Sequence, residues 1–252
     1  MTITATREFQ DDAVVLRTFK SGEADRIAVL WTRRHGKVRV LSRGARKTTS
    51  KIGVHLEPLT WAHVDLVASR GDLYITHTVR TVEHLNVLRA DYDRLNAGFA
   101  VLEALDALAE DGSADEGLFE VLTRVLKTLN DDTFRPHLVP TTFFLRLLSF
   151  DGSALVVDRC VSCEGDEGLV SFDATAGGLL CAACRSGVRI SPEGVVLLQR
   201  MLGGDLAGVL REEAPAGAGE VAHLIHEAIE AHVGRRLKVA RNTAPLPELP
   251  DR

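Results

Sequence analysis

The chain has 252 residues, of which 45% are hydrophobic and 26% charged, and its formal net charge is -5. No run approaches the ~18 apolar residues of a membrane span, and the first residues form no hydrophobic signal core, so the sequence predicts a cytoplasmic protein rather than a membrane or secreted one. The charge is uneven, because residues 1–80 hold 14 Lys and Arg against 8 Asp and Glu, whereas the rest holds 16 against 27. This split indicates a basic N-terminal binding face on an acidic body.

The first third of the chain has the pattern of a small β-barrel. Short runs rich in β-branched residues alternate partly between apolar and polar positions, and Gly, Pro and Asp separate them. Five strands within about 70 residues are typical of a closed barrel, for which the OB-fold is the commonest five-stranded case. The predicted strands include residues 14–16, 27–31, 38–41, 61–67 and 73–79.

A basic window lies inside this predicted barrel. Between Asp25 and Glu57 there are nine Lys and Arg and no acidic residue. A solvated face usually mixes both signs, so an unmixed run on two strands and the following loop favours a groove that follows a phosphate backbone. Trp31 and Trp61 are candidates for base stacking, although a core position is the commoner one for tryptophan. The candidate nucleic-acid-binding residues are Arg33, Arg34, Lys37, Arg39, Arg43, Arg46, Lys47 and Lys51.

From about residue 84 the apolar period changes to that of helices. Ser113 to Glu116 reads as a capping box for a helix through Leu129, and Ser191 reads as the N-cap of a later helix. Further helices are expected over residues 95–105, from Pro140 to about 151, from about Asp205, and over 221–236.

The four cysteines of the chain form two Cys-x-x-Cys pairs with a Gly-rich segment between them. This spacing is typical of four thiolates that hold one structural Zn²⁺, because an intervening hairpin brings the second pair opposite the first. Two disulfides or a dithiol redox site are the alternatives, and the absence of a signal peptide disfavours disulfides. The predicted ligands are Cys160, Cys163, Cys181 and Cys184, with one zinc per chain.

These patterns predict an α+β multi-domain protein: an N-terminal five-stranded OB-fold barrel, then a helical bundle with an inserted four-cysteine zinc knuckle. The expected domains are 1–83 (OB-fold, nucleic-acid-binding), 84–152 (helical domain, first part), 153–189 (zinc knuckle), 190–240 (helical domain, second part) and 241–252 (disordered tail). Since the two helical parts each have an apolar stripe, we expect them to pack together.

The sequence gives no support for catalysis. His226-Glu227 resembles the start of a metalloprotease motif, but position 230 is Glu where that motif needs a second His. The hydrolase, phosphate-loop and dinucleotide-binding signatures are also absent from the sequence. We therefore expect no catalytic residues.

Several short motifs resemble one family over nearly the whole chain. Gly22 to Ile27, His35 to Arg39, Ser42 to Lys47 and Glu57 to Leu59 are similar to the N-terminal signature of the bacterial RecO recombination-mediator family, and His232 to Lys238 resembles its C-terminal segment. The order of parts also matches. Some members of that family lack the cysteines.

The resemblance implies a non-catalytic protein of DNA repair and homologous recombination. Such a protein would bind single- and double-stranded DNA, anneal complementary strands, join a RecR partner and help to load recombinase onto strands coated by single-strand-binding protein, in the cytoplasm near the nucleoid. Two alternatives stay open: a zinc-containing nucleic-acid enzyme, and an accessory protein of transcription or translation. The enzyme would need clustered carboxylates or an activated nucleophile beside the basic face.

Overall fold

A computed structural model of the chain describes residues 8–69 and 71–239. The described residues divide into two compact units. The first holds the chain up to Asn86 together with Leu105–Lys127, and the second holds Val87–Ala104 and the chain from Thr128 onward. The predicted domain boundaries stay a prediction.

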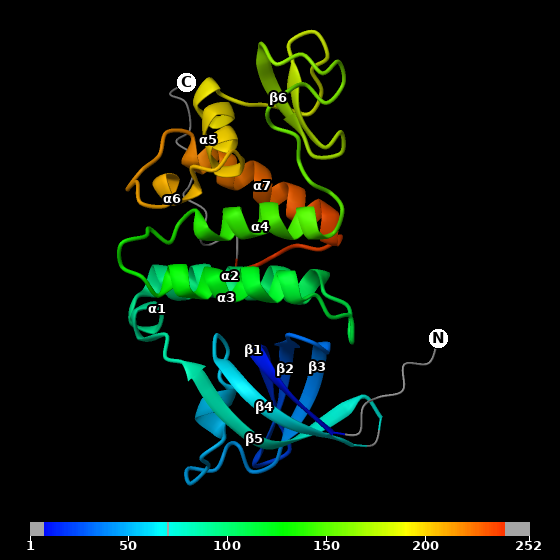
Figure 1. Cartoon of the computed structure of the whole chain (residues 1–252), viewed down its shortest axis with the longest axis vertical. Coiled ribbons are helices and arrows are strands. Elements are labelled where there is room, and N and C mark those ends of the chain that lie inside the picture. The colour runs from blue at the N-terminus through cyan, green and yellow to red at the C-terminus, as the bar shows by residue number, and fades with distance from the viewer. Residues whose placement is uncertain (1–7, 70, 240–252) are drawn as a thin grey trace. The chain divides into compact units, whose positions relative to one another are not determined.

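A closed five-stranded barrel forms most of the first unit (Figure 1). The strands follow one another around the barrel in the order β1-β2-β3-β5-β4, and of these pairings that between β3 and β5 is parallel. A short 3-10 helix, η1 (Gly53–Leu56), lies between β3 and β4. The predicted OB-type barrel is therefore confirmed. The strands are β1 (Glu8–Ser21), β2 (Asp25–Thr32), β3 (Gly36–Ser42), β4 (Trp61–Ala68) and β5 (Leu73–Glu83).

Alternating side chains of these strands fill the barrel, because successive residues of a strand point to opposite faces. The buried interior contains residues such as Val15, Leu30, Val40 and Val64. The two tryptophans are also buried, with 2% of Trp31 and 9% of Trp61 exposed. The interpretation of both as core residues is confirmed, and neither presents a ring to a base.

The helix α3 (Glu116–Leu129) begins differently from the prediction. Its cap is Asp115, whose Oδ1 accepts a hydrogen bond of 2.9 Å from the Leu118 backbone N–H, so the capping box that starts at Ser113 is wrong. Ser113 instead belongs to a loop that packs on the turn between β2 and β3, where a Cβ on Gly36 would collide with the Ser113 carbonyl oxygen. Gly36 has a φ of 66° and leaves room for that approach.

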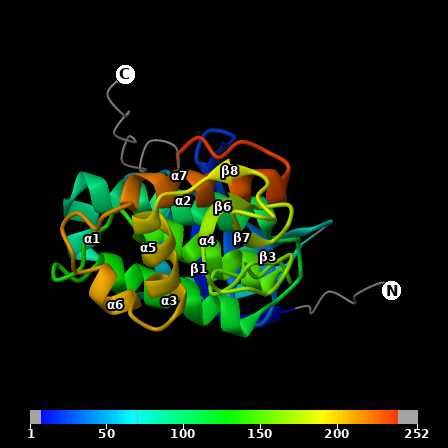
Figure 2. The same ribbon diagram turned by 90° about the horizontal axis from the view of Figure 1, so that it is seen from above.

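Helices form the body of the second unit (Figures 1 and 2). α4 packs against α7, and the rings of Phe144 and His226 meet edge to face with 6.3 Å between centroids. The helical segments before and after the cysteines thus pack together, as the apolar stripes predicted. Apart from Asn86 and the last turn of α2 from Leu105, which belong to the first unit, its helices are α1 (Asn86–Ala90), α2 (Tyr92–Leu108), α4 (Val139–Phe150), α5 (Pro192–Leu202), α6 (Leu206–Val209) and α7 (Ala218–Val233).

The ends of these later helices follow from local chemistry. The Ser191 hydroxyl accepts a hydrogen bond from the Gly194 N–H, which confirms Ser191 as the cap of α5. α7 ends at Val233 rather than at Arg236, because Gly234 adopts a left-handed φ of 67° that stops the helix. The tail predicted to be disordered lies outside the described residues. No helix of residues 8–69 and 71–239 has the length and apolarity to cross a membrane.

A small three-stranded sheet, separate from the barrel, carries the cysteine segment. Its strands are β6 (Leu169–Asp173), β7 (Gly178–Cys181) and β8 (Val188–Arg189), in the order β7-β6-β8. β6 and β7 form the hairpin that the Gly-rich segment predicted, and we call Val157–Ile190 the cysteine ribbon.

Candidate metal centre and nucleic-acid interface

The four cysteine sulfurs converge on one point. All four Sγ atoms lie within 4.8 Å of one another, and those of Cys163 and Cys181 are 3.7 Å apart. A tetrahedron with metal–sulfur bonds of about 2.3 Å has sulfur–sulfur edges of about 3.8 Å, so this spacing matches one four-cysteine site. It is the only cluster of three or more His, Cys, Asp or Glu with metal-ligand geometry within residues 8–69 and 71–239.

Two tight turns and one hairpin position the sulfurs. In the first turn the Glu164 N–H donates to the Cys160 carbonyl, and Glu164 has a left-handed φ of 64°. In the second, the Cys184 N–H donates to the Cys181 carbonyl. The pairing of β6 with β7 sets Leu169 opposite Cys181, which brings the two turns to the same end of the hairpin.

Backbone amides prepare these sulfurs to hold a cation. The N–H groups of Cys181 and Cys163 lower the pKa of the Cys160 thiol to about 6. The N–H of Cys184, followed by that of Ala183, lowers the pKa of Cys181. At Cys163 the Gly165 N–H acts in the same direction, but the three neighbouring sulfurs outweigh it and raise the pKa to about 11. A cation at the centre of the cluster would favour the thiolate at all four positions, including the one that the neighbouring sulfurs oppose.

The donor set fits a structural metal. Four thiolates complete a tetrahedron and leave no open position for substrate or water. Soft sulfur ligands select zinc, copper(I) or iron over magnesium or calcium. Cys160 is fully buried and Cys163 is exposed, so one edge of the site faces solvent.

The basic window divides into two groups in the structure. Five of its nine cations pair with acidic residues, and three of the five meet acids between Asp106 and Glu120. Arg39 lies 3.0 Å from Asp111, Arg33 lies 3.6 Å from Glu120, and the Lys37 amine lies within 3.8 Å of both Asp106 and Asp111. Arg34 lies 3.4 Å from Asp11, and Arg26 pairs with Glu57 at 2.6 Å. These pairs give five of the nine cations of the window a counter-charge within the protein.

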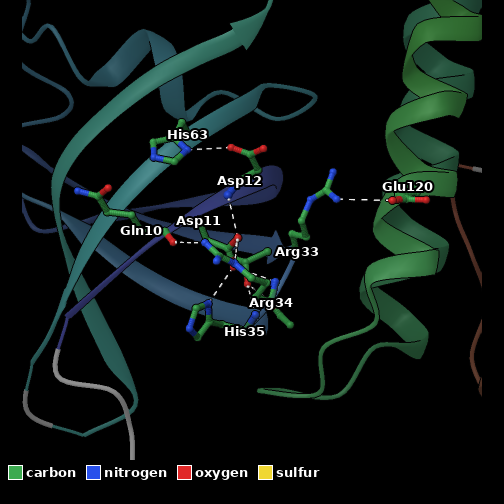
Figure 3. A network of polar contacts seen from close by, with 10 residues as sticks. Gln10, Asp11, Asp12, Arg33, Arg34, His35, His63 and Glu120 are labelled. Atoms are coloured by element: carbon green, nitrogen blue, oxygen red, sulfur yellow. Dashed lines mark hydrogen bonds and ion pairs between the residues drawn. The ribbon is translucent and has the colours of Figure 1, made fainter.

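The turn between β2 and β3 is held by a buried carboxylate, as Figure 3 shows. Asp11 is 1% exposed and accepts hydrogen bonds from the Arg34 backbone N–H at 2.8 Å and from the His35 ring at 2.8 Å. The Arg34 side chain donates to the Gln10 carbonyl at 2.9 Å, and His35 stacks on Phe9 with 3.7 Å between ring centroids. Asp11 therefore fixes the direction in which Arg34 leaves the turn.

The second group of cations lies on the loop after β3 and is exposed. The Gly44 N–H donates to Asp25 at 2.8 Å, and the Arg46 guanidinium donates to the carbonyls of Gly22 and Glu23 at 3.3 and 3.0 Å. These bonds order the backbone and still leave the charges uncompensated by carboxylates within the part of the chain that the structure describes. We call Arg43–Lys51 the basic loop, and its cations are Arg43, Arg46, Lys47 and Lys51.

Sequence reasoning missed the acids that face the window. Asp106, Asp111 and Glu120 are roughly 70 to 90 residues from the cations they meet, and a helical pattern gives no signal for such pairs. It also missed Phe19, which lies on β1 with 46% of its surface exposed. Period-two alternation along β1 was the available signal, but a bulge between Val15 and Arg17 shifts it.

These features define a class: an OB-type barrel with a basic loop, followed by helices and a four-cysteine cluster that could hold a metal ion. Comparison with protein families shows to which family of this class the chain belongs. The family described as "Recombination protein O N terminal" matches residues 6–85, and "Recombination protein O C terminal" matches residues 89–241. The chain belongs to the RecO family of DNA repair proteins.

Three relatives named "DNA repair protein RecO" illustrate the likeness. The protein of Streptomyces griseus subsp. griseus is 35% identical over 88% of this chain and 94% of its own length. That of a Nocardioides species is 36% identical over 91% and 96%, and that of Streptomyces avermitilis is 37% identical over 78% and 83%. The likeness therefore includes both the barrel and the helical region.

Proposed function

We propose that this chain is a non-catalytic mediator of DNA repair and homologous recombination. It binds single- and double-stranded DNA through the barrel and anneals complementary strands. With a RecR partner it assists recombinase loading onto single strands coated by single-strand-binding protein. The observation that carries the proposal is the basic loop, whose exposed cations extend from an OB-type barrel in a chain of the RecO family.

Phosphate neutralisation supplies the affinity in this proposal. Each Lys or Arg that contacts a phosphate releases a condensed counterion, so binding depends on salt and little on sequence. Arg43 and Arg46 can present two donors to one phosphate, whereas Lys47 and Lys51 act as point charges. Two strands whose charge is neutralised on the same protein repel each other less, which favours annealing without nucleotide hydrolysis. Arg33, Lys37 and Arg39 stay within the proposed interface, but their ion pairs reduce what they contribute.

The metal in this proposal is one structural zinc per chain, held by the cysteine ribbon. Zinc supplies the thiolates with a counter-charge and the ribbon with a cross-link, and a closed shell of four cysteines leaves it no catalytic position. The basic window itself contains no carboxylate that could hold a catalytic ion. We keep the domain division at residues 83, 152, 189 and 240 and the cytoplasmic, nucleoid-associated location as parts of the same proposal.

An annealing assay tests this function. Two complementary fluorescently labelled strands are mixed with the purified chain without nucleotide, and annealing is expected to be faster than the spontaneous reaction. A control with Arg43, Arg46 and Lys47 replaced by Ala should lose most of that acceleration. Cleavage of either strand in the presence of Mg²⁺ would support the enzyme alternative, and binding without any acceleration would support the accessory-protein alternative.

A further inference from the structure

A row of apolar side chains crosses the outer surface of the barrel. The strand pairing sets Phe19 opposite Ile27, Ile27 opposite Leu41, and Leu41 opposite Ile75. Directly paired residues point to the same side of a sheet, and the chain neighbours Ala28 and Val40 point into the core, so the row points outward. It joins four strands that follow one another in the barrel, β1, β2, β3 and β5.

This row is unusual for an outer barrel surface, because it offers an exposed ring beside aliphatic side chains. Phe19 is 46% exposed, and Ile27, Leu41 and Ile75 are half-buried. With neighbouring strands about 4.8 Å apart, the row extends over roughly 14 Å. A sheet surface of this kind accommodates two or three bases in RNA-recognition modules.

Cations border the row along the barrel. The Arg17 guanidinium lies 4.8 Å from the centroid of the Phe19 ring, and a 2.7 Å ion pair with Asp106 holds it there. Two residues after Leu41, the exposed Arg43 begins the basic loop, whereas the paired residues of the intervening register, Lys20, Arg26 and Ser42, point to the opposite face of the sheet. The row therefore ends close to the basic loop, whose first cation is Arg43.

We propose that Phe19 is a base-stacking residue for single-stranded DNA, and that Ile27 and Leu41 extend the surface on which the following bases lie. This inference rests on the proposed DNA binding and deepens it. The basic loop binds the phosphates, and the bases stack on the apolar row. Because every base has a π face, stacking on the row does not depend on base sequence. The bases of a duplex are already stacked on one another and cannot reach the row. The row thus makes the barrel favour single strands, whereas the loop binds both DNA forms.

Two oligonucleotides of equal charge separate base contacts from phosphate contacts. One is oligo(dT), and the other has the same backbone with abasic sites in place of the bases. The wild-type chain should bind oligo(dT) about tenfold more tightly than the abasic strand, because stacking a base on an aromatic ring is worth about 1–3 kcal/mol. Phe19→Ala should remove most of this difference, leave the salt slope unchanged and leave duplex affinity within about twofold.

Phe150→Ala is the matched control, since Phe150 is exposed to a similar degree, 42%, in the other unit. It should leave every affinity unchanged. Phe19→Trp should restore the preference for oligo(dT), and its fluorescence should be quenched by oligo(dT) but not by the abasic strand. This second variant also keeps the test valid if Phe19→Ala folds poorly.

The outcomes distinguish a failure of the proposed function from a failure of the base-stacking proposal alone. If the wild-type chain binds neither DNA form, the proposed function itself fails. If it binds both oligonucleotides equally, or if Phe19→Ala keeps the full preference for oligo(dT), the base-stacking role of Phe19 is refuted and the phosphate-binding loop stands.

Discussion

The barrel and the cysteine ribbon are both small β-structures, but different interactions hold them together. The barrel closes its strands on themselves and encloses a continuous apolar core that includes Val15, Leu30 and Val64. The ribbon has only short strands, of which β8 has two residues, and its buried apolar side chains are few, among them Phe172 and Leu179. The barrel can therefore fold by burial, whereas we expect the ribbon to depend on a metal cross-link at its cysteines.

The two regions also differ in their proposed roles, which are ligand binding for the barrel and a structural role for the ribbon. On the barrel, half of the predicted cations pair with acids and the rest extend from the basic loop, so charge there is available to a ligand. In the ribbon, the four cysteine sulfurs converge on one point and would form a closed shell around a single metal ion. The two regions should consequently respond to different perturbations.

Removal of the metal should produce the largest effect, confined to the ribbon. Structural zinc in small fingers contributes about 10–16 kcal/mol to folding, so a strong chelator should unfold a segment that cannot form its own core. We expect hydrogen exchange to become fast in peptides from Val157–Ile190, while peptides from β1 to β5 keep their protection.

Cys181→Ser should reproduce this pattern without chelator, and Ser162→Ala, on the turn between the first two ligands, is the matched control. Elemental analysis should give one zinc per wild-type chain. If the purified chain contained no metal and the amides of the ribbon were still protected from exchange, the ribbon would not depend on a metal for its fold.

A core truncation in the barrel should produce the converse result. Leu30 is fully buried, and Leu30→Ala should lower the free energy of unfolding by about 2–5 kcal/mol because it leaves a cavity. Denaturant titration should show this loss equally with and without chelator, and the zinc content should not change.

Val54→Ala provides the comparison, since Val54 is 68% exposed and should change stability by no more than about 0.5 kcal/mol. A loss on Leu30→Ala that disappears after metal removal would mean that the two regions fold as one unit.

Lys37→Ala should destabilise the barrel more than it weakens DNA binding. The Lys37 amine donates to the Asp106 carbonyl at 3.1 Å and lies near the carboxylates of Asp106 and Asp111, with 12% of the side chain exposed. Truncation removes these contacts from the 10% exposed Asp106, which keeps its ion pair with Arg17, so we expect a loss of about 1 kcal/mol.

Lys51→Ala is the opposite case, because Lys51 is an exposed cation of the basic loop. It should leave the denaturation midpoint unchanged and weaken DNA binding. If both variants changed only DNA affinity, the ion pairs of Lys37 would not stabilise the barrel.

The parts that sequence reasoning predicted well are those with a local signal. The strands follow from β-branched runs between turn residues, the helices from their apolar period, and the four-cysteine cluster from the spacing of two pairs. The parts that it missed depend on contacts far apart in the chain. Asp106 and Asp111 meet Lys37 only after the barrel closes, and Asp115 replaces the predicted cap because the barrel turn at Gly36 engages Ser113. No local pattern encodes such contacts.

The most direct test of the account is the salt dependence of single-strand affinity for two triple variants. One replaces Arg43, Arg46 and Lys47 by Ala, and the other replaces the exposed Arg235, Arg236 and Lys238, so that both lose three charges. With a slope of about 0.7 per phosphate contact, the loop variant should lower the slope of log affinity against log salt by about 2. Both variants should stay folded, since exposed substitutions typically change stability by about 0.5 kcal/mol or less. An unchanged slope in the loop variant together with a reduced slope in the C-terminal variant would contradict the account and move the DNA site to the second unit.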